Sequence, residues 1–408
     1  MKVKYEITDD LQVFKQSNEI RINYSNDFID ETVQIIPSGL LFDDSVAPQD
    51  VYFKILDGLP VLFSNERNEN IGFDVFSAAF YMLSRYEEYL EFKPDEHGRF
   101  PLKESLSFRH DFYERAIVHH WVDLLINILE HKYEHLSVTR NSYRFVASFD
   151  IDNAYAYLHK NWFRTIGGLA KDLLTNQNNL KDRINVIRGK QKDPYDNYDF
   201  ILENSKQLNG KPLFFILTSD DGKFDKNISP KHPAFEKLVS QLKNHGEISI
   251  HPSYQSHDSI QKLKSEINTL RQISQKEISF SRQHFIKLRF PQTFENLIAS
   301  GISDDYSLGY PEASGFRSGC AVAYPFFNLK KNETSELMLH PFYFMDATYL
   351  FYQKMSFEDI MQRLKQIIDE VKAVQGTFYP LWHNECFGGE KANEWRELLL
   401  WTHEYARG

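Results

Sequence analysis

Five ionisable side chains in this sequence come at or shortly after apolar runs that are typical of buried strands. They are Asp150 and Asp152 after "FVASF", His251 after "EISI", His284 after "ISFSR" and His383 at the end of "TFYPLW". One carboxylate with two imidazoles is a standard ligand set for zinc or a neighbouring transition metal. A second carboxylate can accept a proton from water, and a further imidazole can protonate a leaving amine. This set is sufficient for metal-assisted hydrolysis of an amide.

Each of these residues also has a purely structural interpretation. The Asp-Ile-Asp pair can cap a helix that begins at Asn153, and each histidine can be a hydrogen-bonded core residue or can tie down a loop. For His232 and His340, which sit in other His-Pro dipeptides, the structural interpretation is kept. Asp220 and Asp221 lie in the predicted turn "TSDDGKFD", where they either touch substrate or serve only the turn. The shared position past strand ends is what favours the functional interpretation of the five.

Such residues converge only in a fold that brings the ends of several strands together. From Phe145 onward, short apolar runs alternate with amphipathic stretches such as "HPAFEKLVSQLKNHG". This alternation is typical of parallel strands with crossover helices. In an α/β barrel the carboxyl ends of all strands open on one face, where active sites are built. The sequence therefore predicts an α/β sheet or barrel with the five residues at its mouth.

Residues 1–140 differ from the rest of the chain in residue types and hydrophobic pattern. They indicate a smaller accessory domain of α+β type, which precedes the α/β domain at 141–408. The first 70 residues or so are rich in β-branched and aromatic residues with turn signals, which indicates short strands. Helices are expected near Phe76 to Leu83, with Asp74 as N-cap, and from Glu114 to His131. The aromatic residues of this part are expected to pack in a core rather than to bind sugar.

The bulk composition sets limits on the class of protein. With 408 residues, 42% of them hydrophobic, the chain can bury a large core. The formal charge of −10 gives no net attraction for nucleic acid or anionic lipid, and no basic groove is marked. Two cysteines are too few for a disulfide framework, and no apolar run has the length of a signal peptide core or a membrane span. We expect a cytoplasmic protein; the oligomeric state is not predicted.

The same segments resemble the polysaccharide deacetylase family, the metal-dependent N-deacetylases of sugars. "SFDID" resembles the first motif of that family, "GEISIHPSY" the second, "FSRQHF" with "TFENLIASGISDDYSLGY" the third, and "FYPLWHNE" the last. The resemblance covers about residues 143–390 and implies a distorted (β/α) barrel of about seven strands. The chain is more closely similar to a bacterial branch of the family whose members carry an extra N-terminal domain.

The resemblance also implies a role for each matching residue. Asp150 would be the base, Asp152 and His251 would be metal ligands, Arg282 would orient Asp150, and His383 would be the acid. The metal implied is divalent, zinc before other transition metals.

Two departures from the family pattern leave alternatives open. The second motif usually has a second histidine four residues after the first, but here that position is Gln255. The third ligand is then His284, which follows a neighbouring strand, or His257 as the next choice. Ile151 is an extra residue between the two aspartates, which still face the same side if the chain is extended there. On a turn the two carboxylates need not do so, and their roles can exchange.

The leading hypothesis is a metal-dependent hydrolase that removes an acyl group, acetyl first, from an amino sugar or glycan precursor. Asp305, Arg317, Tyr254 and Trp382 are the predicted substrate contacts, and Asp346 either orients a catalytic group or serves only the structure. One rival is a glycan-binding protein on a decayed hydrolase barrel, for which Gln255 is the best support. A second rival is an amidohydrolase of a non-sugar amide.

Overall fold

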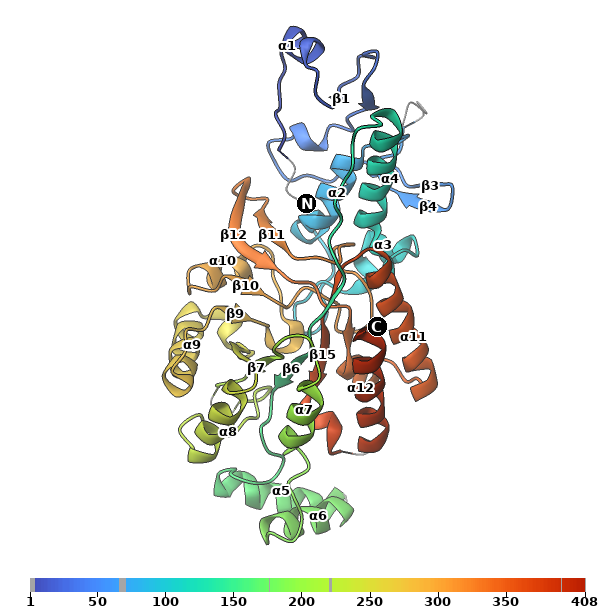
Figure 1. Cartoon of the computed structure of the whole chain (residues 1–408). Helices are drawn as coiled ribbons and strands as arrows, with labels where there is room; N and C mark the ends of the chain where they lie inside the picture. The colour runs from blue at the N-terminus through green and yellow to red at the C-terminus, as the bar shows by residue number, and fades with distance from the viewer. Residues whose placement is uncertain (1–3, 66–70, 176, 220–221, 390, 408) are drawn as a thin grey trace.

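The computed structural model describes residues 4–65, 71–175, 177–219, 222–389 and 391–407. Within these residues, the larger part of the chain is built on one mixed sheet of nine strands (Figure 1). Every neighbouring pair in it is parallel except β11 with β12. The strands in sheet order are β11 (Tyr324–Asn328), β12 (Glu333–Leu339), β10 (Asp304–Asp305), β9 (Phe280–Ser281), β8 (Glu247–Ile250), β7 (Leu213–Ile216), β6 (Ser148–Ile151), β15 (Pro380–His383) and β13 (Phe344–Met345). The predicted α/β class is therefore confirmed.

One extended segment, residues 333–345, supplies two members of this sheet. Its first part is β12, which pairs with β10, and its last part is β13, which pairs with β15 near the other edge. Among the described residues no ladder joins β13 to β11, so the distorted seven-stranded barrel stays a prediction.

Helices follow most of the parallel strands, as the sequence alternation predicts. Side chains cap the first turns of several of these helices. Ser259 and Ser356 accept hydrogen bonds from backbone N–H groups of α9 and α11, and the ring of His232, the N-cap of α8, accepts from Ala234 N. The helices are α5 (Trp162–Thr175), α6 (Gln177–Ile187), α7 (Tyr198–Ser205), α8 (Pro233–Lys243), α9 (Ile260–Ser274), α10 (Gln292–Ile298), α11 (Phe357–Ala373) and α12 (Ala392–Arg407). The apolar faces of the last six of these helices pack with the sheet in one large buried cluster.

The N-terminal part has its own apolar cluster around the buried Trp121. Asp74 caps α2 by accepting from Ser77 N at 3.0 Å, as predicted, and the second predicted helix is α4. β1 pairs with β2, β3 with β4, and β5 reaches across to β14 in the C-terminal part. The elements are α1 (Leu11–Gln16), β1 (Ile22–Tyr24), β2 (Val33–Ile35), β3 (Lys54–Leu56), β4 (Leu59–Val61), α2 (Val75–Leu83), α3 (Leu106–Arg109), α4 (Ile117–Lys132), β5 (Arg144–Phe145) and β14 (Thr377–Phe378). A domain boundary at residue 140 stays a prediction.

Candidate metal centre

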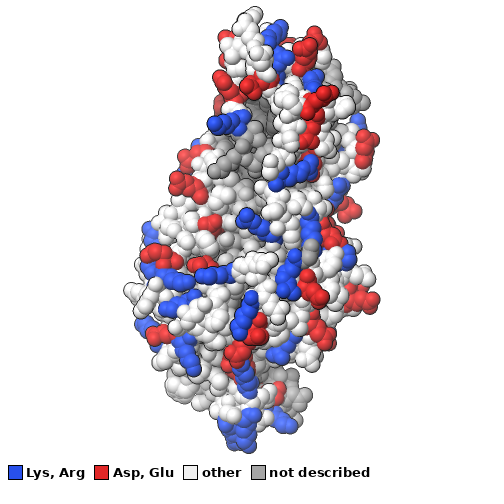
Figure 2. Space-filling view, viewed as in Figure 1, with Lys and Arg blue, Asp and Glu red and all other residues white. Residues whose placement is uncertain are grey.

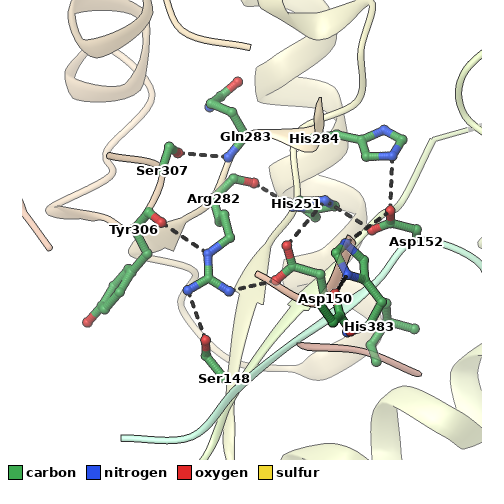
Figure 3. A network of polar contacts seen from close by, with 12 residues as sticks. Ser148, Asp150, Asp152, His251, Arg282, Gln283, His284, Tyr306, Ser307 and His383 are labelled. Atoms are coloured by element: carbon green, nitrogen blue, oxygen red, sulfur yellow. Dashed lines mark hydrogen bonds and ion pairs between the residues drawn. The ribbon is translucent and has the colours of Figure 1, made fainter. Parts of the chain in front are cut away.

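Asp152 and two histidines meet where four adjacent parallel strands end. Asp152 comes one residue after β6, His251 directly follows β8, and His284 begins a 3₁₀ turn (His284–Ile286) shortly after β9. Asp152 Oδ1 lies 3.1 Å from His251 Nε2, and Asp152 Oδ2 lies 3.2 Å from His284 Nε2. One ligand-type atom from each of the three lies within 4.8 Å of the others. Figure 3 shows both rings turned toward Asp152. Parallel pairing thus brings together residues that are far apart in the sequence.

The hydrogen bonds on the far side of each ring decide which nitrogen faces the cluster. His251 Nδ1 lies 2.6 Å from the Arg282 carbonyl oxygen, and His284 Nδ1 lies 2.9 Å from Asp225 Oδ1. Both partners accept hydrogen bonds, so each Nδ1 carries the hydrogen. In this tautomer a neutral ring presents an Nε2 lone pair toward the carboxylate of Asp152. Lone pairs and a negative charge that converge in this way attract a cation, which is either a proton or a metal ion.

Two further observations fit a divalent metal at this point. Asp152 Oδ1 is buried and makes no hydrogen bond to any described residue, despite its closeness to His251. Burial alone would raise the pKa of Asp152 and lower that of His284. The attraction between them instead lowers the pKa of Asp152 well below its usual range and raises the pKa of His284 to about 9. The negative potential that holds a proton there also attracts a metal ion, and one carboxylate with two imidazoles suits zinc.

Asp150 lies beside the cluster in β6 and is held by a buried arginine. Arg282 Nη1 donates to Asp150 Oδ1 at 2.7 Å, and Asp150 Oδ2 lies 3.7 Å from His251 Nε2. The guanidinium also donates to Ser148 Oγ at 2.9 Å and to the Tyr306 carbonyl at 3.0 Å, as Figure 3 shows. Neither ion of this pair is more than 1% exposed. Arg282 therefore pairs with the Asp150 carboxylate and fixes its direction.

His383 approaches the cluster from β15, which pairs with β6 so that His383 lies opposite Asp150. Its Nδ1 lies 2.6 Å from Asp346 Oδ1, and its backbone N donates to Asp346 Oδ2 at 2.7 Å. Its Nε2 lies 3.7 Å from Asp152 Oδ2. Burial opposes charge on this ring, but Asp346 and Asp152 outweigh it and raise the pKa of His383 to about 10. Of the two interpretations of Asp346, the geometry matches the one in which it orients another group.

A cavity of about 330 Å³ opens over these five residues. One wall is apolar and includes Met345, Leu350, Phe351 and Leu381. A cavity with an apolar wall and a few convergent polar groups is the usual form of a small-molecule site.

Sequence reasoning missed two charged residues of this cavity, Arg99 and Glu385. Arg99 belongs to the N-terminal part, yet its Nη1 donates to the Phe285 carbonyl at 2.7 Å, next to His284. Burial and the charge of Asp152 raise the pKa of Glu385 to about 7. Glu385 lies two residues after His383, where β15 ends, so the position of charged residues just past strand ends could have identified it.

Asp225 was also missed, although it holds the His284 ring. It lies in the loop after β7, 59 residues before its partner. It is the last residue of the predicted turn "TSDDGKFD", where the sequence drew attention to Asp220 and Asp221 instead; those two lie outside the described residues.

The four predicted substrate contacts do not line the cavity. Arg317 is fully buried and pairs with Glu88 at 2.6 Å, Asp305 is fully buried and accepts from two serines, and Trp382 lies in the apolar core. Tyr254 contacts His97, with its hydroxyl 3.2 Å from the ring nitrogen. Arg317, Asp305 and Trp382 are thus held in the packed interior, whereas Tyr254 is partly exposed; the role of all four as substrate contacts stays a prediction.

The structure also places three other residues that the sequence analysis discussed, namely His257, Gln255 and His340. His257, the second choice for a ligand, is not in the cluster, and burial with the charge of Lys287 lowers its pKa to about 4. Gln255 accepts from Lys262 Nζ at 2.6 Å. His340 pairs with Asp304 at 2.7 Å, in line with its structural interpretation.

Comparisons with known proteins give partial likenesses. The model of a family of unknown function, DUF7033, matches residues 1–134. A search of curated proteins gave no match. Solved structures with some similarity include a probable polysaccharide deacetylase from Pseudomonas aeruginosa PAO1, with 10% identity over 65% of this chain and 85% of that one and a TM-score of 0.43. A polysaccharide deacetylase from Bacillus cereus has 12% identity over 64% and 87%, with a TM-score of 0.30. A CE4 family pseudoenzyme from Bacillus anthracis has 10% identity over 66% of both chains, with a TM-score of 0.33.

Proposed function

We propose that this protein is a metal-dependent hydrolase that removes an acyl group from an amino sugar. The observation that carries the proposal is the convergence of Asp152, His251 and His284, with Asp150 and His383 beside them over one cavity. The amino-sugar part comes from the resemblance of the motifs around these residues to those of the polysaccharide deacetylases.

In this proposal Asp152, His251 and His284 hold a divalent metal, with zinc as the first choice because two imidazoles and one carboxylate are a common ligand set of catalytic zinc. Lewis acidity toward water and toward the substrate carbonyl is the chemistry that such a metal supplies when bound. Asp225 and the Arg282 carbonyl keep the two histidine rings in the tautomer that leaves Nε2 free for the metal.

Two other side chains move protons. Asp150 accepts the proton of the attacking water, and the ion pair with Arg282 holds its carboxylate in place. His383 donates a proton to the leaving amine from Nε2, while Asp346 holds its Nδ1–H. The partners of the two side chains match these roles: Asp150 is paired with the Arg282 guanidinium, whereas the Asp346 carboxylate helps to raise the pKa of His383 and so favours its protonated form.

The test is metal analysis of the purified protein, followed by release of amine from N-acetylated sugars. We expect about one bound zinc and an activity that is lost with a chelator and restored by the metal. The Asp150→Asn variant should keep the metal and lose the activity. Protein that stays free of metal after reconstitution would end the proposal, and sugar binding that persists in chelator without hydrolysis would favour a binding protein instead.

A further inference from the structure

Helix α5 turns an apolar face outward. Its large apolar side chains are between 57% and 85% exposed; they are Trp162, Phe163, Ile166, Leu173 and Leu174. At 100° per residue these positions fall on a single stripe along the helix. A water-exposed helix normally shows polar residues on that side, so this stripe is an exposed apolar patch of the kind that marks an interaction site.

The polar side of α5 faces the protein instead. Asp172 is buried, and its Oδ2 accepts from Arg183 Nε of α6 at 2.6 Å. Arg183 in turn lies over the Tyr157 ring, with its guanidinium carbon 4.5 Å from the ring centre. These contacts fix the rotation of α5 about its axis, and the apolar stripe therefore stays directed outward.

The segment around this stripe is strongly basic. Residues 160–192 contain eight Lys and Arg and two Asp, a net charge of +6 within a chain of net charge −10. Several of the cations are exposed; they include Lys181, Arg188 and Lys190. Figure 2 shows blue side chains gathered next to white ones at the lower end of the molecule, where α5 and α6 lie in Figure 1. A chain of net negative charge thus carries a local excess of positive charge in this segment.

We propose that the α5–α6 face docks on an anionic lipid surface. The apolar stripe would enter the boundary between headgroups and acyl chains, and the surrounding Lys and Arg would contact lipid phosphates. Charge favours this occupant over a second copy of the chain, because two basic faces repel each other. The binding is peripheral, since no helix in the described part of the chain is long and apolar enough to cross a membrane.

The docking face belongs to the same insertion that frames the cavity. α5 and α6 lie between β6 and α7, and residues at both ends of this insertion, Asp152 and Tyr195, line the cavity. Lipid binding would thus hold the cavity close to the membrane surface. The proposal does not depend on the hydrolase function and can be tested without it.

The test is co-flotation of the full chain with lipid vesicles. We expect binding to phosphatidylcholine vesicles that contain about 30% phosphatidylglycerol, weaker binding in high salt, and little binding to phosphatidylcholine alone. The apolar double variant Phe163→Asp/Leu174→Asp should reduce the binding by about tenfold or more. Charge reversal should do the same; the variant carries Lys181→Glu, Arg188→Glu and Lys190→Glu.

Matched controls place the same changes elsewhere on the surface. Val122 and Leu400 are 39% and 42% exposed, so Val122→Asp/Leu400→Asp should leave vesicle binding unchanged. Circular dichroism and metal content should be alike in all variants. Equal affinity for neutral and anionic vesicles, or full binding by the apolar variant, would overturn the proposal. So would a dimer in light scattering that Phe163→Asp/Leu174→Asp converts to a monomer, because the stripe would then be an interface between copies.

Discussion

The Asp225→Asn substitution tests whether the cluster at the strand ends is a metal centre. Asp225 contributes no atom to the cluster; it accepts from His284 Nδ1 at 2.9 Å and from Tyr254 N at 2.9 Å. Asparagine has the same shape and can still accept both bonds, so the fold should persist. What changes is the negative charge behind the His284 ring and the preference for the tautomer that presents Nε2.

The magnitude follows from the geometry. The Asp225 charge lies roughly 5 Å from the metal-facing nitrogen of His284, where a unit charge is worth about 3 kcal/mol at an effective dielectric constant of about 20. Asparagine keeps part of that interaction through its dipole. We therefore expect a loss of about 1.4 to 2.7 kcal/mol in metal binding, which is a 10- to 100-fold weaker affinity.

The assay is a competition titration of zinc between the protein and a chromogenic chelator at neutral pH. The matched control is Asp304→Asn, which removes the carboxylate from another imidazole pair, His340 Nε2 to Asp304 Oδ1 at 2.7 Å, outside the cluster. We expect one site per chain in all three proteins, weakened only in Asp225→Asn. Wild-type affinity in Asp225→Asn, or an equal loss in the control, would refute the proposed role of the carboxylate behind His284.

Three further predictions follow from the same contacts. Asp150→Asn should lower kcat for amide hydrolysis by about 10²- to 10⁴-fold with zinc content unchanged, as measured by amine release and metal analysis. Arg282→Met should lower the free energy of unfolding in urea by about 3–5 kcal/mol, because it leaves the Asp150 carboxylate buried without its cation; adding Asp150→Asn should recover part of the loss, and strictly additive losses would contradict the pairing. His119 is partly buried and its Nε2 accepts from Ala321 N at 3.0 Å, and the loss of hydration lowers its pKa to about 4. Its stabilising contribution is fully present above the unfolded pKa of about 6.5 and is lost as pH falls through the folded pKa of about 4; the loss reaches about 2 kcal/mol at pH 5. Urea unfolding at pH 7.5 and 5.0 should show a smaller pH effect in His119→Gln, and an equal effect in both proteins would exclude this ring as the cause.

The strand-end pattern located the five residues of the cluster because it is a local property. An apolar run marks a buried strand, and the polar residue that follows must lie at the sheet edge where the strand ends. Parallel pairing of β6, β7, β8 and β9 then places Asp152, His251 and His284 together. Arg317 and Asp305 were predicted as substrate contacts without this pattern, and the structure buries both side chains. The sequence does not show whether a charged side chain meets a ligand or a buried partner such as Glu88.

The amino-acid sequence by itself determined the alternation of strands and helices, the residue types at each strand end, and the excess of positive charge in residues 160–192. All three depend on near neighbours in the chain. Only the tertiary structure decided that Asp225 and Asp346 stand behind the His284 and His383 rings, that Arg99 reaches the cavity, and that α5 turns its apolar stripe outward. These are pairings between distant segments, and they depend on how helices and loops pack against the sheet, for which neighbouring residues carry no signal.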